Sequence, residues 1–426
     1  MMLYYLNYDG FGCGVFESQV LTPLALLRQR GWRPRLIDYE NALDPPSLDD
    51  YRRQCVQELG EPPIILRKSV RCNFIISARQ VRRLASLLRR REPAGGTVLL
   101  HGRGCFAGYL ALKAKQILAR EGGLRVRVVT DLRGLVSEEY RLEWADRGRL
   151  LRLAATWAAE RTRRVEQYVA EHSDQLLCVS QRFREYLSRQ YPTSRRRIAV
   201  IPTGIERRRL QFDPAARQRF RTIYGLSGSF VVVYCGGGQS WQSPRLMLET
   251  FGRIRARIPE AKLLLLTNEP LGFEEHAATC GLRPEDYLIL RVEHRLVGEY
   301  LSMADCALLV REPHLVNEVA SPTKFAEYLS CNLPVAVSPG IGDTAAVIRK
   351  YGVGCFTDEL EQLRGLSSQS AALRANFQNA VDDLYSWEVH LDKLIAIYQR
   401  LLAEAAKEGE LADQPALRGV RNGLGL

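Results

Sequence analysis

The residues best suited to chemistry in this sequence lie together in one short stretch, which runs from Ser321 to Glu327. Ser321 and Pro322 favour the start of a helix, because a hydroxyl suits the N-cap and proline suits the first helical position. Lys324 then lies in the first turn, where the helix dipole disfavours a cation by about 0.3–1 kcal/mol unless an anion lies between it and the free amides. The stretch therefore predicts a phosphate site at Lys324.

Glu327 lies near the same helix face, one turn further on, and its carboxylate could accept hydrogen bonds from both hydroxyls of a ribose. A plain i,i+3 ion pair between Lys324 and Glu327, worth roughly 0.2–0.5 kcal/mol, accounts for the same spacing without any ligand. The residue types alone leave these two interpretations about equal.

The surrounding pattern predicts the elements that position this pair. Residues 307–310 form an apolar run typical of a buried strand, and residues 311–320 are predicted as a polar loop. The helix is followed by another buried strand at residues 335–337. A glycine-rich turn then leads into a second helix, for which Asp343 is the predicted N-cap.

Length and composition indicate two globular domains. A chain of 426 residues exceeds what one hydrophobic core usually fills, so we expect two domains of roughly 200 residues. The sequence is 46% hydrophobic and 25% charged, and no apolar run approaches the roughly 18 residues of a membrane span. The N-terminus enters a strand-like segment directly, without the basic stretch of a signal peptide, which predicts a cytoplasmic protein.

Metal-ligating patterns are missing from the sequence. The ten cysteines are scattered singly, without CxxC spacing or clustered histidines, so neither a zinc site nor a disulfide framework is predicted. The sequence Asp-x-Asp also does not occur. We therefore expect no metal site and no cofactor.

Strands and helices alternate along both halves of the chain, which predicts parallel sheets covered by helices. The first half ends with a strand at residues 198–201, and the second restarts with a strand at residues 230–234. One long helical region is predicted at about 141–172. Glycines between residues 8 and 15 follow the first strand, at the end of a strand where α/β sheets bind ligands.

The formal net charge of +12 comes mainly from arginine. The basic clusters are not interleaved with aromatic residues and match no nucleic-acid-binding motif, so nucleic acid is not an expected partner. An anionic membrane surface is a better match, since each basic residue near it contributes about 1 kcal/mol. An arginine-rich composition without any such partner explains the charge equally well. The clusters assigned to membrane docking are Arg82-Arg83, Arg89–Arg91 and Arg161–Arg164.

The pattern SPTKxxEYLxxxxPV at residues 321–335, followed by a glycine-rich turn, resembles the donor-binding signature of family 4 nucleotide-sugar glycosyltransferases of the GT-B fold. The segments HSDQLLCVSQRFREYL and RIAVIPTGIE resemble the end of that family's N-terminal domain. The segment EHRLVGEYLSMADCALLV resembles the stretch before the donor site. The resemblance in sequence covers about residues 170–400. For the first 170 residues, only the predicted architecture is similar.

This resemblance implies an α/β fold of the GT-B type, with two Rossmann-like, doubly wound domains that face a cleft. We expect an N-terminal acceptor domain at residues 1–203 and a C-terminal nucleotide-sugar donor domain at 204–385. The amphipathic segment 386–404 is expected to pack back on the N-terminal domain as a helix, and 405–426 to be a flexible tail.

The resemblance also implies a site. The phosphates would meet backbone amides together with Lys324, Glu327 would meet the ribose, and two glycines of the first loop would let the backbone of the other domain approach the same ligand. His101 and Arg133, predicted at strand ends facing the cleft, are candidates for polarising the sugar or acceptor, although a structural hydrogen bond explains each equally well. The phosphate-binding amides are those of Gly237, Gly238, Ser321, Pro322 and Thr323, and the first-loop glycines are Gly12 and Gly14.

Two departures from the family pattern concern charge. Where many members carry Arg and Lys to clamp the diphosphate, this sequence has Gln239 and Ser240, and Arg245 is the nearest replacement. Of the family's two glutamates eight residues apart, Glu327 matches the second. The first falls on Val319, with Glu318 as the adjacent candidate.

The predicted function is therefore transfer of a sugar from a nucleotide-sugar donor to a surface-polysaccharide or lipid-linked glycan acceptor. The expected enzyme is metal-independent, retains anomeric configuration, and works in the cytoplasm or on the inner face of the membrane. A GT-B sugar-nucleotide epimerase and a non-catalytic donor-binding scaffold are the alternatives.

Overall fold

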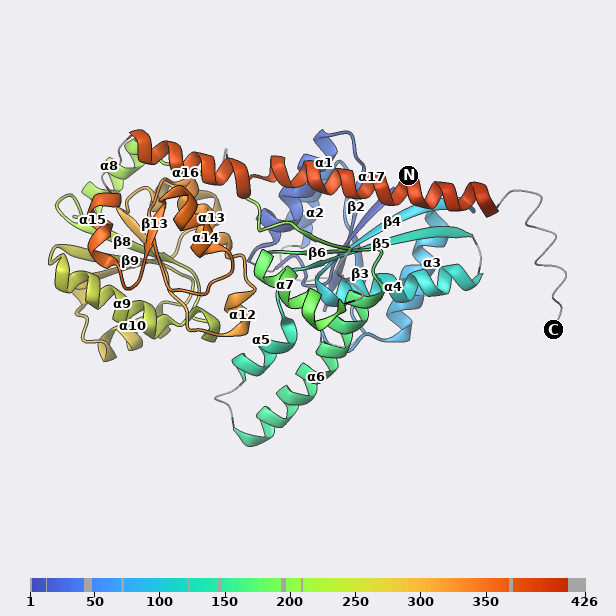
Figure 1. Cartoon of the computed structure of the whole chain (residues 1–426), viewed down its shortest axis with the longest axis horizontal. Coiled ribbons are helices and arrows are strands. Elements are labelled where there is room, and N and C mark those ends of the chain that lie inside the picture. Colours follow the sequence, from blue (N-terminus) through green and yellow to red (C-terminus); the bar gives the residue numbers. More distant parts are fainter. Residues whose placement is uncertain are drawn as a thin grey trace.

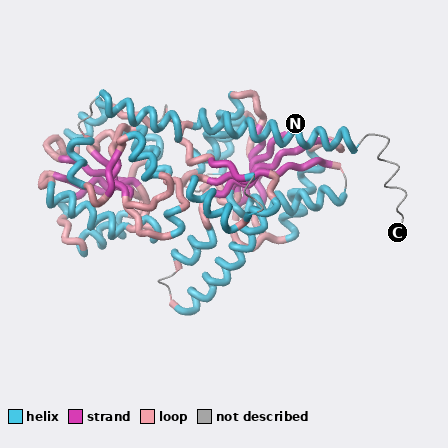
Figure 2. The backbone as a smooth tube through the Cα atoms, viewed as in Figure 1, coloured by secondary structure: helices cyan, strands magenta, loops and turns pink. Residues whose placement is uncertain are grey.

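The structure is a computed structural model that describes residues 2–12, 14–41, 48–69, 73–121, 123–144, 148–192, 197–207, 210–367 and 371–412. It consists of two domains that lie side by side, each with a parallel sheet enclosed by helices (Figures 1 and 2). This architecture confirms the predicted α/β class with two doubly wound domains.

The N-terminal domain is built on a seven-stranded parallel sheet in the order β3-β2-β1-β4-β5-β6-β7. The order reverses beside β1, so the chain winds helices onto both faces of the sheet. The strands are β1 (Met2–Asn7), β2 (Pro34–Glu40), β3 (Ile64–Arg67), β4 (Gly96–Arg103), β5 (Leu124–Leu132), β6 (Gln175–Cys178) and β7 (Ile198–Val200).

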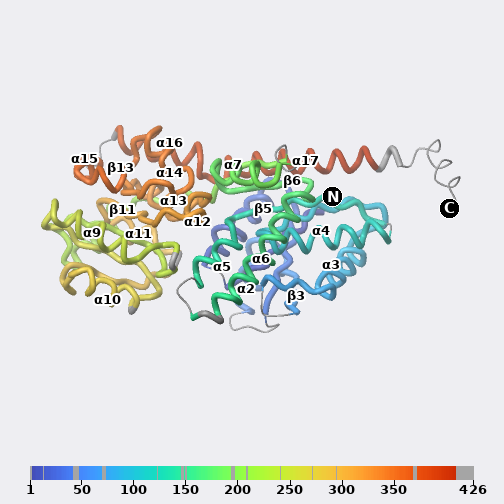
Figure 3. Tube along the Cα trace, turned by 60° about the horizontal axis from the view of Figure 1, so that its bottom comes forward, coloured from blue at the N-terminus to red at the C-terminus, as the bar shows by residue number. Residues whose placement is uncertain are grey.

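Apolar side chains from the two faces of this sheet form two separate cores. The helices around them are η1, a π-helical turn (Glu17–Leu21), α1 (Thr22–Gln29), α2 (Leu48–Leu59), α3 (Ala78–Arg91), α4 (Gly104–Glu121), α5 (Val136–Glu143), α6 (Arg149–His172) and α7 (Gln181–Gln190). The predicted helical region at about 141–172 is made of two helices, α5 and α6, which form the arms of a hairpin that projects from the domain (Figures 1 and 3).

The C-terminal domain has a six-stranded parallel sheet in the order β10-β9-β8-β11-β12-β13. Its strands are β8 (Phe230–Cys235), β9 (Ala261–Leu266), β10 (Tyr287–Leu290), β11 (Cys306–Leu309), β12 (Val335–Val337) and β13 (Gly354–Phe356). Its helices are α8 (Pro214–Ile223), α9 (Pro244–Arg257), α10 (Pro270–Thr279), α11 (Val297–Leu301), α12 (Leu315–Glu318), α13 (Thr323–Ser330), α14 (Thr344–Tyr351), α15 (Leu363–Leu366) and α16 (Ala371–Leu384), with short 3-10 turns η3 (Ser240–Gln242), η4 (Pro284–Asp286), η5 (His294–Leu296) and η6 (Leu360–Gln362).

The last helix, α17 (Trp387–Ala412), returns to the N-terminal domain and lies along it (Figure 1). Its apolar face enters one of the two N-terminal cores through Leu391, Leu394, Tyr398 and Leu401. The chain crosses between the domains twice at one place, where Ile205 and Ser386 form a parallel β-bridge. The helix continues past the predicted end at residue 404, and the rest of the predicted tail, 413–426, lies outside the described residues.

The predicted caps around α13 and α14 differ from the structure. Pro322, not Ser321, is the N-cap of α13, and the polar loop before it contains the short helix α12. Asp343 makes no capping hydrogen bond to its own helix. Its carboxylate instead accepts from the backbone amides of Gln181, at 2.7 Å, and Arg182, at 3.3 Å, and so caps α7 in the other domain.

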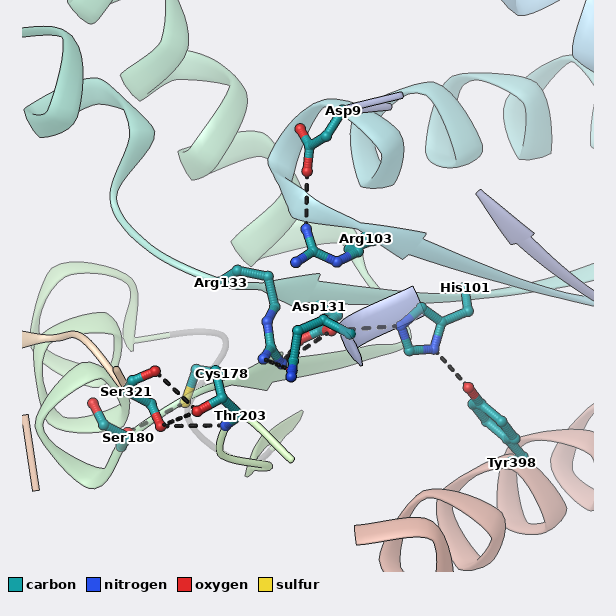
Figure 4. A network of polar contacts seen from close by, with 11 residues as sticks. Asp9, His101, Arg103, Asp131, Arg133, Cys178, Ser180, Thr203, Ser321 and Tyr398 are labelled. Carbon is teal, nitrogen blue, oxygen red and sulfur yellow. Dashed lines mark hydrogen bonds and ion pairs between the residues drawn. The ribbon is translucent and has the colours of Figure 1, made fainter. Parts of the chain in front are cut away.

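Ser321 likewise contributes to the contact between domains. Its hydroxyl accepts from the backbone N–H of Thr203 at 3.2 Å, and its carbonyl accepts from the Thr203 hydroxyl at 3.0 Å (Figure 4). Nearby, the Ser180 hydroxyl donates to the carbonyl of Val319 at 2.8 Å. These bonds link the loops that precede α7 and α13.

Within the part of the chain that the structure describes, every helix is either too short or too polar to cross a bilayer.

Candidate functional site

A cavity of about 290 Å³ lies at the carboxyl ends of β1, β4 and β5, where the sequence predicted ligand binding for the N-terminal domain. Arg133, immediately after β5, lines it, together with Arg103 at the end of β4 and Asp9 after β1. Trp241 of η3 reaches it from the C-terminal domain, so both domains contribute to its wall.

Charges of both signs line this cavity. Arg103 pairs with Asp9 at 2.9 Å (Figure 4). Burial, reinforced by the negative charges of Asp9 and Glu143, raises the pKa of Glu139 to about 7. A carboxyl group in this state can hold a proton at neutral pH and donate a hydrogen bond as well as accept one. The cavity is therefore suited to hydroxyl groups, which need both kinds of partner.

A second cavity, of about 310 Å³, also lies between the domains and contains Glu327. Glu17, Ser18 and Thr22 face it from η1 and α1, and Arg295 faces it from the C-terminal domain. Glu327 was predicted to meet a ribose, and the tertiary structure places it beside a space large enough for part of a nucleoside.

Lys324 and Glu327 form an ion pair of 2.7 Å on α13. The Glu327 side chain is 2% exposed and that of Lys324 is 29% exposed, so the carboxylate is the deeper partner. Burial opposes the charge of Lys324, but the neighbouring Cys235 and Glu327 outweigh it and raise the lysine pKa above its usual value. The ion pair that explains the spacing without a ligand thus exists, and the Lys324 side chain is partly exposed at the start of a helix.

The glycine turn after β8 is occupied by a carboxylate that the sequence analysis missed. Glu269, two residues into the loop after Thr267, accepts from the backbone N–H of Gly238 at 2.6 Å and from the Gln239 amide at 3.3 Å. The predicted phosphate-binding amide of Gly238 is therefore already bound to an anion. A carboxylate that accepts from an exposed backbone amide resembles the interaction that a phosphate oxygen would make there.

We expect replacement of Glu269 by glutamine to increase nucleotide affinity. The change removes a negative charge that would repel a diphosphate and that competes for the Gly238 amide, so affinity should rise about three- to tenfold. Isothermal titration calorimetry with a nucleoside diphosphate would measure it. Glu274→Gln, on the exposed face of α10, is the matched control and should leave the nucleotide affinity unchanged. An unchanged or weaker affinity for the Glu269 variant would show that this amide does not bind the nucleotide.

A second cation near Lys324 was also missed. Arg245 does not replace the family's diphosphate clamp, because it pairs with Glu249 on an exposed face of α9. Arg311, after β11, acts electrostatically on the same group as Lys324 does. Burial raises the pKa of Tyr234, and the positive charges of Arg311 and Lys324 both oppose that rise, so both cations act on one phenol. Only the fold brings them together, since thirteen positions separate them in sequence.

The glycines of the first loop leave room for a ligand. A β-carbon added to Gly12 or Gly14 would meet no atom within 4 Å, and both residues are exposed. A β-carbon added to Gly237 would lie 2.5 Å from the Gln239 side chain, so a larger residue at position 237 would fit only if the Gln239 amide moved. Glu318, the proposed partner of Glu327, is exposed at the end of α12.

The prediction that His101 lies at a strand end facing the cleft is wrong. His101 lies inside β4, is 2% exposed, and packs between the sheet and α17. Its Nδ1 lies 2.6 Å from the Tyr398 hydroxyl and its Nε2 3.8 Å from the Asp131 carboxylate. The sequence could not indicate this, because the partner on α17 is 297 positions away.

Two Rossmann-like domains with a charged cleft between them define the GT-B class, and solved structures of that class match the chain. Among them are HepE from Anabaena in complex with UDP-glucose, with a TM-score of 0.68, 12% identity, and coverage of 94% of this chain and 100% of that chain. Sucrose-phosphate synthase from Thermosynechococcus elongatus matches with a TM-score of 0.66 and 16% identity, over 95% and 100% of the two chains. WaaG, a glycosyltransferase involved in lipopolysaccharide biosynthesis, matches with a TM-score of 0.62 and 17% identity, over 93% of this chain and 99% of that chain.

Residues 17–209 match the family model of Glycosyltransferase Family 4. This segment of the chain is therefore similar to that family, and the whole chain has the GT-B fold, as the sequence motif implied. No curated protein sequence matches it. The family match covers the N-terminal domain and the crossing to the next, whereas the motif that first carried the resemblance lies in the C-terminal domain.

Proposed function

We propose that this protein transfers a sugar from a nucleoside-diphosphate sugar to a hydroxyl of a glycan acceptor, either a surface polysaccharide or a lipid-linked glycan. The observation that carries the proposal is the Lys324–Glu327 pair at the start of α13, with the buried carboxylate facing an interdomain cavity. Glu327 would accept from the ribose hydroxyls, and Lys324 and Arg311 would neutralise the diphosphate as it leaves. HepE and its UDP-glucose complex support UDP-glucose as the first donor to test.

The cavity at the carboxyl ends of β1, β4 and β5 would then hold the acceptor. Its mixture of Arg103, Asp9 and Glu139 offers donors and acceptors to a polyhydroxylated molecule. Arg133 lines the same cavity and would polarise the transferred sugar or the acceptor.

The direct test is a screen of UDP-, GDP- and ADP-sugars with oligosaccharide and lipid-linked acceptors, followed by mass spectrometry of the products. Transfer to an acceptor would support the proposal, and NMR of the anomeric proton would test the expected retention. Conversion of the donor to an epimer without acceptor would favour an epimerase. Tight binding with no turnover of any donor would favour a scaffold.

We propose that transfer needs no divalent metal. Cationic side chains and helix N-termini can stabilise the leaving diphosphate, which is the role that a metal has in other glycosyltransferases. Turnover should therefore stay within about twofold when EDTA is added. Activity that is lost in EDTA and restored by Mn²⁺ or Mg²⁺ would refute the metal-free reaction.

We also propose that the enzyme docks on an anionic membrane through α6, which would bring the cleft to a lipid-linked acceptor. Three of the six exposed large apolar side chains of the described residues lie on this helix, namely Leu151, Leu153 and Trp157. The Arg161 guanidinium lies 5.8 Å from the centre of the Trp157 ring. An exposed apolar surface beside basic side chains suits the interface of an anionic bilayer.

Ion pairs reduce the charge of the arginine clusters on which the sequence-based prediction depended. Arg163 and Arg164 both pair with Glu160, and Arg89 pairs with Glu121. We therefore expect the exposed apolar side chains of α6 to contribute as much to docking as the arginines do.

Flotation with phosphatidylglycerol-containing liposomes tests this docking. Leu153→Ser combined with Trp157→Ser should reduce the bound fraction at least fivefold, because both apolar side chains are more than half exposed. Ile223→Ser on α8, where the side chain is 63% exposed, is the matched control and should float as the wild type does. Equal recovery on neutral vesicles, or none on anionic ones, would refute membrane docking.

A further inference from the structure

We propose that Tyr398 and His101 are positioning residues, which act through Asp131 to hold Arg133 in the cleft. The four side chains form one continuous polar chain from the C-terminal helix to the cavity wall (Figure 4). The inference rests on the proposed function, because it assigns the last member, Arg133, to the transfer site.

The first link determines which nitrogen of His101 carries the proton. In the part of the chain that is described, the Tyr398 hydroxyl contacts one polar partner, Nδ1 of His101 at 2.6 Å. Burial raises the pKa of Tyr398 well above its usual value, so the hydroxyl stays protonated. It therefore donates a hydrogen bond to its one polar partner, Nδ1. An imidazole that accepts at Nδ1 carries its hydrogen on Nε2.

The second link lies on the other side of the same ring. Nε2 points to the Asp131 carboxylate at 3.8 Å, so the tautomer set by Tyr398 presents an N–H to a negative charge. The opposite tautomer would present a lone pair to that carboxylate and repel it. Tyr5 stacks on the imidazole with ring centres 4.5 Å apart, which holds the ring plane.

The third link reaches the cavity. Both oxygens of Asp131 lie 3.4 Å from Nη1 of Arg133, and the Asp131 side chain is 9% exposed. Burial opposes its charge, but Arg133 and His101 outweigh this and lower its pKa. Asp131 therefore stays ionised and can fix the guanidinium that lines the cavity.

Arg133 also reaches the crossing between the domains. Its Nη2 donates to Oε1 of Gln19 at 3.2 Å, and the Gln19 amide nitrogen donates to the carbonyl of Gly204 at 2.7 Å. One guanidinium is thus oriented from two sides, by α17 through His101 and by the interdomain crossing through Gln19. The packing of α17 on the N-terminal domain and the orientation of Arg133 therefore depend on the same set of contacts.

Tyr398→Phe tests the chain, since it keeps the ring in the core and removes only the donor. With the donor found in the screen, we expect kcat to fall about tenfold with the donor KM within twofold, the range known for hydrogen-bonded partners that orient a histidine. His101→Gln should also lower kcat about tenfold and leave the donor KM within twofold. Leu401→Ala on the same helix removes buried packing without touching the chain, and it should lower the melting temperature more than Tyr398→Phe while leaving kcat within twofold. Equal loss of kcat in both α17 variants would overturn the proposal.

A double-mutant cycle separates positioning from a general effect. If Tyr398 acts through Arg133, Tyr398→Phe should lower kcat less than twofold in an Arg133→Gln background. A full tenfold loss in that background would refute the chain. If Arg133→Gln alone leaves kcat unchanged, Arg133 is not a residue of the transfer site, and the proposal fails although transfer itself stands.

A measurement without substrate distinguishes this failure from failure of the proposed function. Nitrogen-15 NMR of labelled histidines, with the His101 signals identified by their loss in His101→Gln, should show a hydrogen on Nε2 and none on Nδ1 in the wild type. Tyr398→Phe should shift these signals towards the Nδ1–H form. An Nδ1–H tautomer in the wild type would overturn the chain whether or not any donor is turned over.

Discussion

Replacement of Glu327 by alanine should weaken nucleotide-sugar binding by about 10- to 150-fold. The carboxylate is buried, lies beside an interdomain cavity and keeps Lys324 in place, so its loss removes a charge-assisted contact worth about 1.5–3 kcal/mol. Lys324→Ala should weaken binding to a similar extent, because the cation is the predicted phosphate partner. Calorimetry with UDP and with the active donor would measure both.

The fold should tolerate these changes unequally. Glu327→Ala leaves an unpaired ammonium, which can turn to solvent because the Lys324 side chain is 29% exposed. Lys324→Ala leaves a buried carboxylate instead, so we expect it to be the more destabilising change, by about 2–4 kcal/mol. Glu299→Ala, which breaks an exposed pair with Arg219 in the same domain, is the control and should change neither binding nor unfolding. A collapsed melting temperature with unchanged affinity would mean that the pair is structural only.

Asp131→Asn should combine a large loss of stability with a large loss of turnover. The substitution keeps the shape of the side chain but leaves Arg133 without its buried anion. Breaking a buried pair typically costs about 3–5 kcal/mol, and a guanidinium no longer held in the cavity should lower kcat at least tenfold. Urea unfolding and steady-state kinetics would measure the two effects.

Asp174→Asn provides the matched control for Asp131. Asp174 is a partly buried carboxylate of the same domain, where it pairs with Lys115 at 2.7 Å and accepts from the backbone N–H of Val128 at 2.7 Å. It precedes β6 and so lies at the opposite end of the sheet from the cleft. Its variant should lose stability and keep kcat. Loss of turnover in both variants in proportion to stability would show that Asp131 has no specific role.

The sequence alone determined the class of fold and the ion pair between Lys324 and Glu327. Alternation of apolar strands with amphipathic helices is a local property, and so is the spacing that places Lys324 and Glu327 on one helix turn. The same local pattern located α17, since its apolar stripe needs a surface to cover. Residues close in sequence on a regular element have positions that geometry dictates, which explains why these predictions are confirmed.

Only the tertiary structure decided which polar groups meet across elements. Asp343 precedes α14 yet caps α7, Glu269 occupies the amide of Gly238, and His101 turns from the cleft to a tyrosine of the last helix. Each of these contacts joins residues that are far apart in the sequence and lie in different elements, loops or domains. Side-chain identity determines what a group can bind, but the choice among distant partners is made when the sheets pack, because burial then penalises a polar atom that has no partner.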